Sequence, residues 1–329
     1  IIYLVITILT FQNHLYSDDE TISIDDYGII SLMYHRFEEN KYPSTNIRIN
    51  DFKEHIKIIE ENKIKFINPR DFEKELTNNK LQRKVLLTID DGFLSFYKNA
   101  WPILKDKKIP FILFVSTREV GAFNYMNWDQ IREISKEEFV EIGNHSHTHE
   151  YLADESEEQI KKDIRKSISI FKENLGKNSV FFSYPFGEYS NNFKDIIKDF
   201  KFKYAFGQHS GVIDETKDLY ELPRYPINEK YGEIERFKSL TKTLPFKYKK
   251  IYPDEKYLSQ SKNPPDVKIE FFNNIKNLKS VNCYSNEGNK WRQSKINFEN
   301  TNTLKIRITE KFVGERGRIN CSLRDPSGL

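Results

Sequence analysis

The segment Val85-Leu86-Leu87-Thr88-Ile89-Asp90-Asp91-Gly92 decides the fold. Its apolar beginning is typical of a buried strand in a parallel sheet, and it ends in two carboxylates and a glycine. Enzymes with α/β folds place their chemistry at strand ends of this kind. Two adjacent carboxylates on a turning backbone point in different directions, so one can bind a cation while its neighbour stays free as a base.

A second segment, His145-Ser146-His147-Thr148-His149, follows another strand-like stretch at 139–144. On a helical turn, the spacing predicts that His145 and His149 share one face. One Asp and two neutral imidazoles form an open site for a divalent metal, with Zn²⁺ as the first candidate. Alone, Asp-Asp-Gly is usually a turn, and a histidine cluster is not always a metal site. The occurrence of both segments in one chain, each at the end of an expected strand, nevertheless indicates metal-assisted hydrolysis.

Strand and helix patterns alternate along the rest of this part of the chain. Short apolar runs predict further strands at 64–68, 111–115, 180–183 and 203–206. Helical periodicity predicts helices at 51–62, 95–107 and 156–175. Ser156 is expected to begin the last helix and Gly176 to end it. This alternation predicts an α/β fold with a parallel sheet or barrel.

A third segment, Ser183-Tyr184-Pro185-Phe186-Gly187, follows the strand expected at 180–183. With it, the chain resembles the polysaccharide deacetylases of the NodB-homology class, a carbohydrate esterase family with the motifs TxDDG, H[ST]xxH and aromatic-Pro-aromatic-Gly. The resemblance covers roughly residues 29–242 and implies a distorted (β/α) barrel. The family often has an arginine before the proline, which this chain lacks. In this respect it is similar to the branch that acts on poly-N-acetylglucosamine.

The resemblance implies a role for each matched residue. Asp91, His145 and His149 would bind the metal, and Asp90 would be the catalytic base. Ser146 would orient the histidine loop by hydrogen bonding. The third segment would contact substrate and offer a backbone N–H to the oxyanion. Its candidate substrate-binding residues are Tyr184, Pro185, Phe186 and Gly187. For its aromatic rings, packing in the core is the alternative, and it is the favoured one for Phe186.

The family's later Leu-x-His motif, which supplies a general acid, has no clear match in this chain. His209, in a loop bracketed by glycines, is the nearest substitute, although an ordinary surface histidine is the alternative. Arg224 is a candidate for binding substrate or for bracing a carboxylate. His35 resembles the family's early Tyr-His and is expected in the cleft, in contact with substrate. His147 falls at a variable motif position and is interpreted as a neighbour.

Together these roles imply a hydrolase acting on carbon–nitrogen bonds other than peptide bonds. Metal-activated water would remove N-acetyl or O-acetyl groups from an extracytoplasmic polysaccharide or other acetylated glycan. Two alternatives stay open: a catalytically weak carbohydrate-binding protein on the same fold, and a metal-dependent esterase or amidase with another acetylated substrate. The formal net charge of +3 does not suggest a nucleic-acid partner.

The N-terminal residues 1–17 are expected to be a partial signal peptide. Their apolar run is too short to span a bilayer and is followed by polar residues. A buried strand is the alternative. The signal interpretation predicts export to the periplasm or the extracellular space, with transient membrane or cell-envelope association as a candidate.

The chain is expected to have a catalytic domain over 18–244, a linker over 245–266 and a small all-β module over 267–329. Alternating apolar and charged residues predict the module's strands, but no closing strand is obvious, which suggests truncation. A carbohydrate-binding role and a structural role are both open for it. Its cysteines, Cys283 and Cys321, are the only two in the chain. In an exported protein we expect them to form one disulfide, with two free thiols as the alternative.

Overall fold

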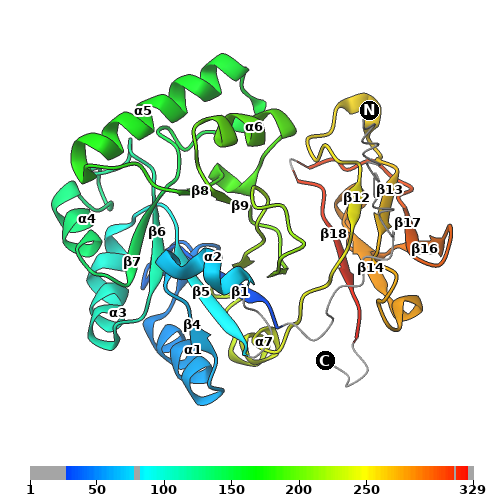
Figure 1. The fold of residues 1–329 in the computed structure, drawn as a ribbon, viewed down its shortest axis with the longest axis horizontal. Helices are drawn as coiled ribbons and strands as arrows, with labels where there is room; N and C mark the ends of the chain where they lie inside the picture. The colour runs from blue at the N-terminus through cyan, green and yellow to red at the C-terminus, as the bar shows by residue number, and fades with distance from the viewer. Residues whose placement is uncertain (1–26, 78–81, 315, 325–329) are drawn as a thin grey trace, which may run out of the picture.

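The structure, a computed structural model, describes residues 27–77, 82–314 and 316–324. A curled sheet with helices around it forms the larger part, and a smaller all-β part lies beside it (Figure 1). The signal peptide predicted over 1–17 lies outside the described residues. Within the described ranges, no helix is long and apolar enough to cross a membrane.

The larger sheet has nine strands, and six of them are parallel neighbours that follow chain order. These are β1 (Ile29–Tyr34), β5 (Lys84–Ile89), β6 (Phe111–Val115), β7 (Val140–Asn144), β8 (Phe181–Ser183) and β9 (Tyr204–Phe206). Every residue of β5 is buried, as in a strand that is covered on both faces. Because the six strands are parallel, their carboxyl ends meet at one edge of the sheet.

Short strands join the two sides of the curled sheet. Leu222 forms a parallel bridge with Phe206 of β9, and β11 (Tyr225–Pro226) pairs in parallel with β1. β10 (Val212–Ile213) pairs with β1 in the antiparallel direction. The segment 222–226 therefore connects β9 to β1, and the sheet forms a half-barrel of the predicted distorted (β/α) type.

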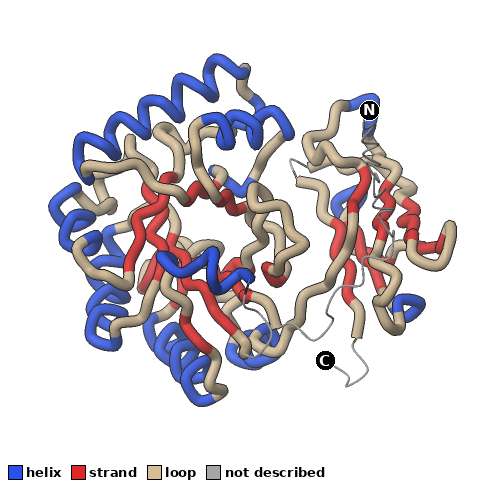
Figure 2. Tube along the Cα trace, in the orientation of Figure 1, coloured by secondary structure: helices blue, strands red, loops and turns tan. Residues whose placement is uncertain are grey.

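Helices surround the sheet (Figure 2). The α-helices are α1 (Ile49–Glu61), α2 (Phe72–Thr77), α3 (Trp101–Lys107), α4 (Trp128–Ser135), α5 (Glu157–Leu175), α6 (Asn191–Asp199) and α7 (Ile234–Leu240). The shorter elements are β2 (Arg36–Phe37), β3 (Asn46–Ile47), β4 (Lys65–Phe66), η1 (Pro69–Asp71), η2 (Phe96–Ala100), η3 (Leu152–Asp154) and η4 (Pro185–Gly187).

The helices agree closely with the sequence prediction. α5 begins after Ser156, whose side chain forms a reciprocal capping box with Gln159, and it ends at Gly176 in the left-handed region. The helix predicted over 95–107 consists of a π-helical turn, η2, followed by α3. These helices fix the loops that leave the carboxyl ends of the strands.

The C-terminal module contains two antiparallel sheets. One has the order β12–β13–β17–β16 and the other β15–β14–β18. Their strands are β12 (Lys250–Tyr252), β13 (Val267–Glu270), β14 (Asn282–Ser285), β15 (Arg292–Gln293), β16 (Lys295–Phe298), β17 (Thr303–Arg307) and β18 (Ile319–Ser322). Three short helical turns connect them, η5 (Gln260–Lys262), η6 (Leu278–Ser280) and η7 (Glu287–Asn289). The predicted all-β module is confirmed, and β18 supplies the pairing strand that the sequence did not reveal.

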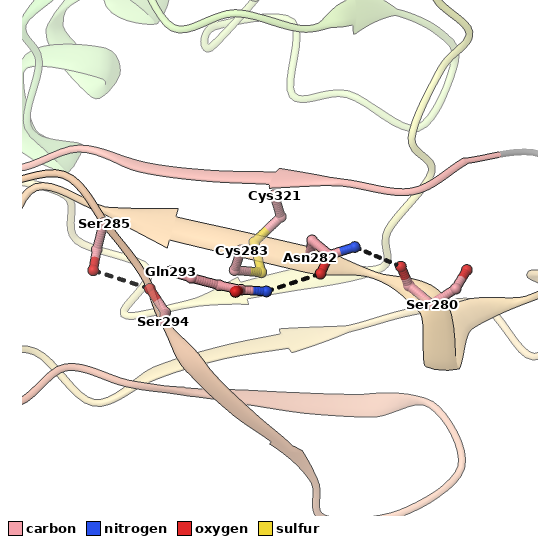
Figure 3. The surroundings of a disulfide bond; sticks show 7 residues. All are labelled: Ser280, Asn282, Cys283, Ser285, Gln293, Ser294 and Cys321. Carbon is pink, nitrogen blue, oxygen red and sulfur yellow. Dashed lines mark hydrogen bonds between the residues drawn. A yellow bond between two sulfur atoms is a disulfide. The ribbon is translucent and has the colours of Figure 1, made fainter. Parts of the chain in front are cut away.

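The predicted disulfide is also confirmed. Cys283 of β14 and Cys321 of β18 are directly opposed in the strand register and are bonded (Figure 3). Cys283 is 1% exposed and belongs to the module's apolar core. The bridge closes a separation of 38 residues, which stabilises the module chiefly by restricting the unfolded chain.

The linker prediction over 245–266 is wrong in part. Residues 250–252 form β12, which pairs with β13, and Phe246 and Tyr248 pack against the module core. Abundant Lys, Tyr and Pro residues hid this strand, because only Ile251 of β12 is apolar and aliphatic. The module therefore begins earlier than the sequence suggested.

Candidate active site

Asp90 and Asp91 follow β5 and point to different partners. The Asp90 backbone N–H donates to the Tyr34 carbonyl at 2.8 Å, which continues the pairing of β5 with β1. Asp91 and Gly92 then adopt left-handed conformations, with φ of 71° and 76°. Asp90 pairs with Arg224, while Asp91 lies against His145 and His149.

Asp90 is fully buried and forms a two-pronged ion pair with Arg224. Nη1 and Nη2 of Arg224 donate to Oδ1 and Oδ2 of Asp90 at 2.7 and 2.8 Å, and both residues are 0% exposed. Burial favours the neutral carboxyl, but the Arg224 guanidinium outweighs it and holds the pKa of Asp90 below its usual range. Asp90 is consequently ionised at neutral pH.

Arg224 lies in the segment that connects β9 to β1. Its remaining donors bind the Gly207 carbonyl at 2.9 Å, Thr88 Oγ1 at 3.2 Å and Ser183 Oγ at 2.8 Å. The prediction that Arg224 contacts substrate is therefore wrong, because its donors are directed at buried protein groups. Of the two roles that the sequence left open, the structure supports the bracing of Asp90.

Asp91, His145 and His149 come together as a group that could hold a metal ion. The Asp91 Oδ1 atom lies 3.3 Å from His145 Nε2 and 3.2 Å from His149 Nε2. The three ligand atoms all lie within 4.8 Å of one another. Burial opposes ionisation of Asp91, but both imidazoles outweigh it and hold the pKa of that carboxyl well below its usual range.

This group fits a divalent cation by its donor chemistry. Asp91 Oδ1 is buried, and the described residues offer it no hydrogen bond of good geometry. His145 Nδ1 lies 2.7 Å from the Ser183 carbonyl, so the Nδ1–H donates there and Nε2 keeps a free lone pair. A carboxylate oxygen and two imidazole nitrogens therefore converge with unused lone pairs.

The histidine loop is not the helical turn that the spacing suggested. Ser146 and His149 have left-handed backbones, with φ of 68° and 54°, and this bend brings the two imidazoles together. Ser146 Oγ accepts the His149 backbone N–H at 3.0 Å. The orienting role predicted for Ser146 is thus confirmed.

Asp163 of α5 holds the same loop, and sequence reasoning did not find it. Its carboxylate accepts the backbone N–H groups of His147 and Thr148 at 2.7 and 2.9 Å. The signal was a buried carboxylate on the apolar face of a helix, between Ile160 and Ile164. His147 Nδ1 lies 2.9 Å from Thr117 Oγ1, and this histidine is not part of the metal-binding group.

The third segment forms the turn η4 beside the histidines. Tyr184 and Pro185 are buried, and the Tyr184 hydroxyl donates to the Tyr220 carbonyl at 3.1 Å, so their prediction as substrate contacts is wrong. Phe186 and Gly187 are half-buried and remain candidates. The Phe186 ring lies 4.8 Å from that of His149 between centroids.

His35 and His209 have different surroundings. His35 is half-buried beside the carboxylate pair; burial is the main cause that lowers its pKa, and Asp91 and Asp90 oppose the shift. His209 is in contact with solvent, and its charged neighbours are cations that include Lys256. Protein packed around the ring and these cations lower the pKa of His209 to about 4. The prediction of His209 as general acid is not supported, because its charged neighbours are cations and the carboxylates of the site are not among them.

Part of the chain is similar to known proteins. Residues 77–205 match the family described as polysaccharide deacetylase. The poly-beta-1,6-N-acetyl-D-glucosamine N-deacetylase of Staphylococcus aureus (strain MSSA476) is 25% identical over 261 residues, which cover 69% of this chain and 90% of that enzyme. The chain is thus similar to polysaccharide deacetylases over the part that carries the three motif segments. The enzyme of the same name from Staphylococcus epidermidis is 28% identical over 213 residues, covering 60% of this chain and 73% of that one.

Solved structures show the same fold. "Structure of IcaB from Ammonifex degensii" has a TM-score of 0.60 and 25% identity, and covers 66% of this chain and 98% of that chain. The Streptococcus pyogenes deacetylase PplD in complex with acetate also has a TM-score of 0.60, with 21% identity over 66% of this chain and 100% of that one. The family-model match and the similar deacetylases together indicate a hydrolase of carbon–nitrogen bonds. The family match contains Asp90, the metal-binding group and η4, and ends before the C-terminal module.

Proposed function

We propose that this protein is a metal-dependent deacetylase that removes N-acetyl groups from a β-1,6-linked N-acetylglucosamine polymer outside the cytoplasm. The observation that carries the proposal is the buried Asp91 oxygen between two imidazoles, next to the braced carboxylate of Asp90. The names of the staphylococcal relatives support the choice of polymer. The disulfide supports an oxidising location, in the periplasm or the extracellular space.

The chemistry divides between the metal-binding group and Asp90. A divalent ion, Zn²⁺ first among the candidates, would polarise the acetyl carbonyl and lower the pKa of a water molecule, commonly to near neutrality. Asp90, kept ionised by Arg224, accepts a proton from the attacking water. Since Arg224 fixes both carboxylate oxygens, Asp90 is held in one orientation throughout the reaction.

The turn η4 offers a donor for the developing oxyanion. The backbone N–H groups of Tyr184, Gly187 and Glu188 donate to the carbonyls of other residues, and Pro185 has no N–H. The Phe186 N–H is thus the candidate oxyanion donor of this turn. Its place beside His149 puts it on the side of the site where the acetyl group would bind.

The departing sugar amine needs a proton, because an amide nitrogen is otherwise a poor leaving group. His35 is the imidazole outside the metal-binding group that faces both carboxylates. We assign it to substrate contact and to the delivery of this proton.

Near Asp91, the half-buried ring of Tyr125 suits contact with a glycan, and the ring of Phe93, 3% exposed, supports it from within. Phe93 and Tyr125 lie 4.8 Å apart between centroids. Burial and then the Asp91 carboxylate raise the pKa of Tyr125 to about 12, which places its hydroxyl near the site. Aromatic faces of this kind can stack on sugar rings.

The test is the release of acetate by the full chain from a panel of acetylated substrates. The panel contains poly-β-1,6-N-acetylglucosamine, a β-1,4-linked N-acetylglucosamine oligomer, acetylxylan and a small acetamide. We expect release from the first substrate, loss of release with a chelator, and recovery when Zn²⁺ is added.

Each other outcome selects a different function. Binding of glycans without acetate release from any substrate would leave a carbohydrate-binding protein on the same fold. Release only from acetylxylan would make the protein an esterase, and release only from the acetamide would make it an amidase. Full activity after complete removal of metal would overturn the metal-dependent mechanism.

A further inference from the structure

The C-terminal module reaches into the active-site turn. Arg316, between β17 and β18, donates from Nη2 to the Phe186 carbonyl at 2.7 Å. Its Nε atom lies 2.5 Å from Oε1 of Glu188, two residues further along the chain. One guanidinium of the module therefore binds both a backbone oxygen and a carboxylate of the turn.

Phe186 is a residue whose conformation needs support. Its backbone is left-handed, with φ of 57°, which is costly for a bulky side chain. Its ring stacks on Tyr151 with centroids 4.0 Å apart and planes 3° apart, and its other neighbour is the His149 ring. Phe186 thus connects Arg316 directly to a residue of the metal-binding group.

The module holds the facing loop as well. Tyr257 hydrogen-bonds to Asp154 of η3, which follows the stacked residue Tyr151. Asp154 and Glu188 each have a partner from the C-terminal part of the chain, Tyr257 and Arg316 respectively.

A third contact fixes the same edge of the barrel. The first residue of α6, Asn191, donates its backbone N–H to Glu255 at 3.0 Å and its Nδ2 to Asp254 at 2.9 Å. Figure 1 shows α6 on the side of the barrel that faces the module. The module contacts η3, η4 and α6, and all three follow strands whose carboxyl ends meet at the active site.

We propose that the C-terminal module is a clamp for the His149 side of the active site, with Arg316 as its positioning residue. Arg316 holds the Phe186 carbonyl and so keeps the Phe186 ring against Tyr151 and His149. It does not touch substrate. The proposal rests on the proposed function only for the task given to His149.

The first test is hydrogen exchange of backbone amides in the full chain, followed by mass spectrometry. In Arg316→Ala we expect exchange in peptides covering 149–156 and 183–190 to rise at least about fivefold, since local opening sets this rate. The matched control is Arg292→Ala, which removes a module arginine that pairs with Glu310 at 2.6 Å and touches neither loop. Unchanged exchange in Arg316→Ala would overturn the clamp.

The second test is steady-state kinetics on the polymer. Displacing a wall of the site by about 1 Å can cost up to about a hundredfold in rate, so we expect about a tenfold lower kcat in Arg316→Ala with KM nearly unchanged. Arg316→Lys should recover part of the loss, because one ammonium can replace only one of the two contacts. Arg292→Ala should match the wild type.

These measurements separate failure of the clamp from failure of the proposed function. A wild type that binds no metal and releases no acetate would overturn the function, while hydrogen exchange would still decide the clamp. A rise in KM for long polymers only, with kcat and exchange unchanged, would make the module a substrate-binding arm and overturn the clamp.

Discussion

Asp90 and His149 lie on two sides of one active site, and the protein holds them by different means. Asp90 is 0% exposed, and buried groups of the barrel surround it: Arg224, Thr88 and Ser183. His149 is half-buried on a bent loop, where its ring contacts Phe186, which the C-terminal module holds through a partly exposed arginine.

The difference separates two demands on a hydrolase. A base must keep one charge state and one orientation, and a fully buried ion pair provides both. A wall that admits a polymer must lie at the surface, where loops are mobile unless something holds them. On the proposed mechanism, the barrel fixes the base, Asp90, and the module fixes the loop wall beside His149.

The substitution expected to have the largest effect on the surroundings of Asp90 is Arg224→Gln. It leaves a buried carboxylate without its cation, which should lower the free energy of unfolding by about 3 to 5 kcal/mol. Urea unfolding and kcat/KM measure the two effects, and we expect activity to be undetectable. The double variant Asp90→Asn with Arg224→Gln should regain stability but no activity. A stable and active Arg224→Gln protein would contradict the bracing role.

Substitutions of His35 and His209 test which of these two histidines acts together with Asp90. Removing a group that transfers a proton typically costs at least about a hundredfold, so we expect His35→Asn to lower kcat/KM by about that factor. His209→Asn should stay within about twofold of the wild type, because its neighbours are cations and not the carboxylate pair. The reverse order of the two losses would restore His209 as the acid.

Asp163→Asn should weaken the support of the loop that carries His149, because Asp163 belongs to helix α5 of the barrel and binds that loop. It replaces an acceptor of two backbone N–H groups with an amide, and losses at residues that support metal ligands are about tenfold to a hundredfold in metal affinity. We expect about tenfold weaker Zn²⁺ binding in a chelator competition. The control is Asp129→Asn, in an exposed ion pair with Arg132. Equal affinity in both variants would show that Asp163 does not support the loop.

His55 is a buried polar residue outside the active site, so its substitution should change the stability of the fold and not the activity. His55 hydrogen-bonds to Tyr34 and to the Gly232 carbonyl, and burial lowers its pKa from 6.5 to about 4. The unfolded chain therefore binds a proton first as the pH falls, so stability is full above 6.5 and decreases towards pH 4, by roughly 3 kcal/mol. Urea unfolding between pH 7 and 4 should show a shallower pH dependence in His55→Gln. An unchanged slope would rule out His55 as its source.

The sequence predicted those parts of the site that lie in short local segments. Asp90, Asp91, His145 and His149 each follow a strand with a clear apolar pattern, and the parallel fold brings such ends together. The sequence offered Arg224 for bracing a carboxylate, but it could not show that this carboxylate is Asp90, because the pairing spans 134 residues and depends on how the sheet closes.

The remaining errors have local physical causes. A spacing of four residues suits a helical turn and also a bend with two left-handed residues, so the form of the His145–His149 loop stayed hidden. The motif suggests that Tyr184 contacts substrate, but its ring packs against Phe182 and Phe193, and the hydrophobic effect favours this burial. The role of Arg316 lies in a contact between two parts of the chain, which no motif records.

The comparison of Asp90→Asn with Asp91→Asn tests the central claim most directly. Both variants change one carboxylate to an amide at adjacent positions, and Zn²⁺ content and acetate release are measured on each. We expect Asp90→Asn to keep the metal and lose turnover, and Asp91→Asn to lose both. An Asp90→Asn protein that keeps its turnover, or an Asp91→Asn protein that binds Zn²⁺ as tightly as the wild type, would contradict the account.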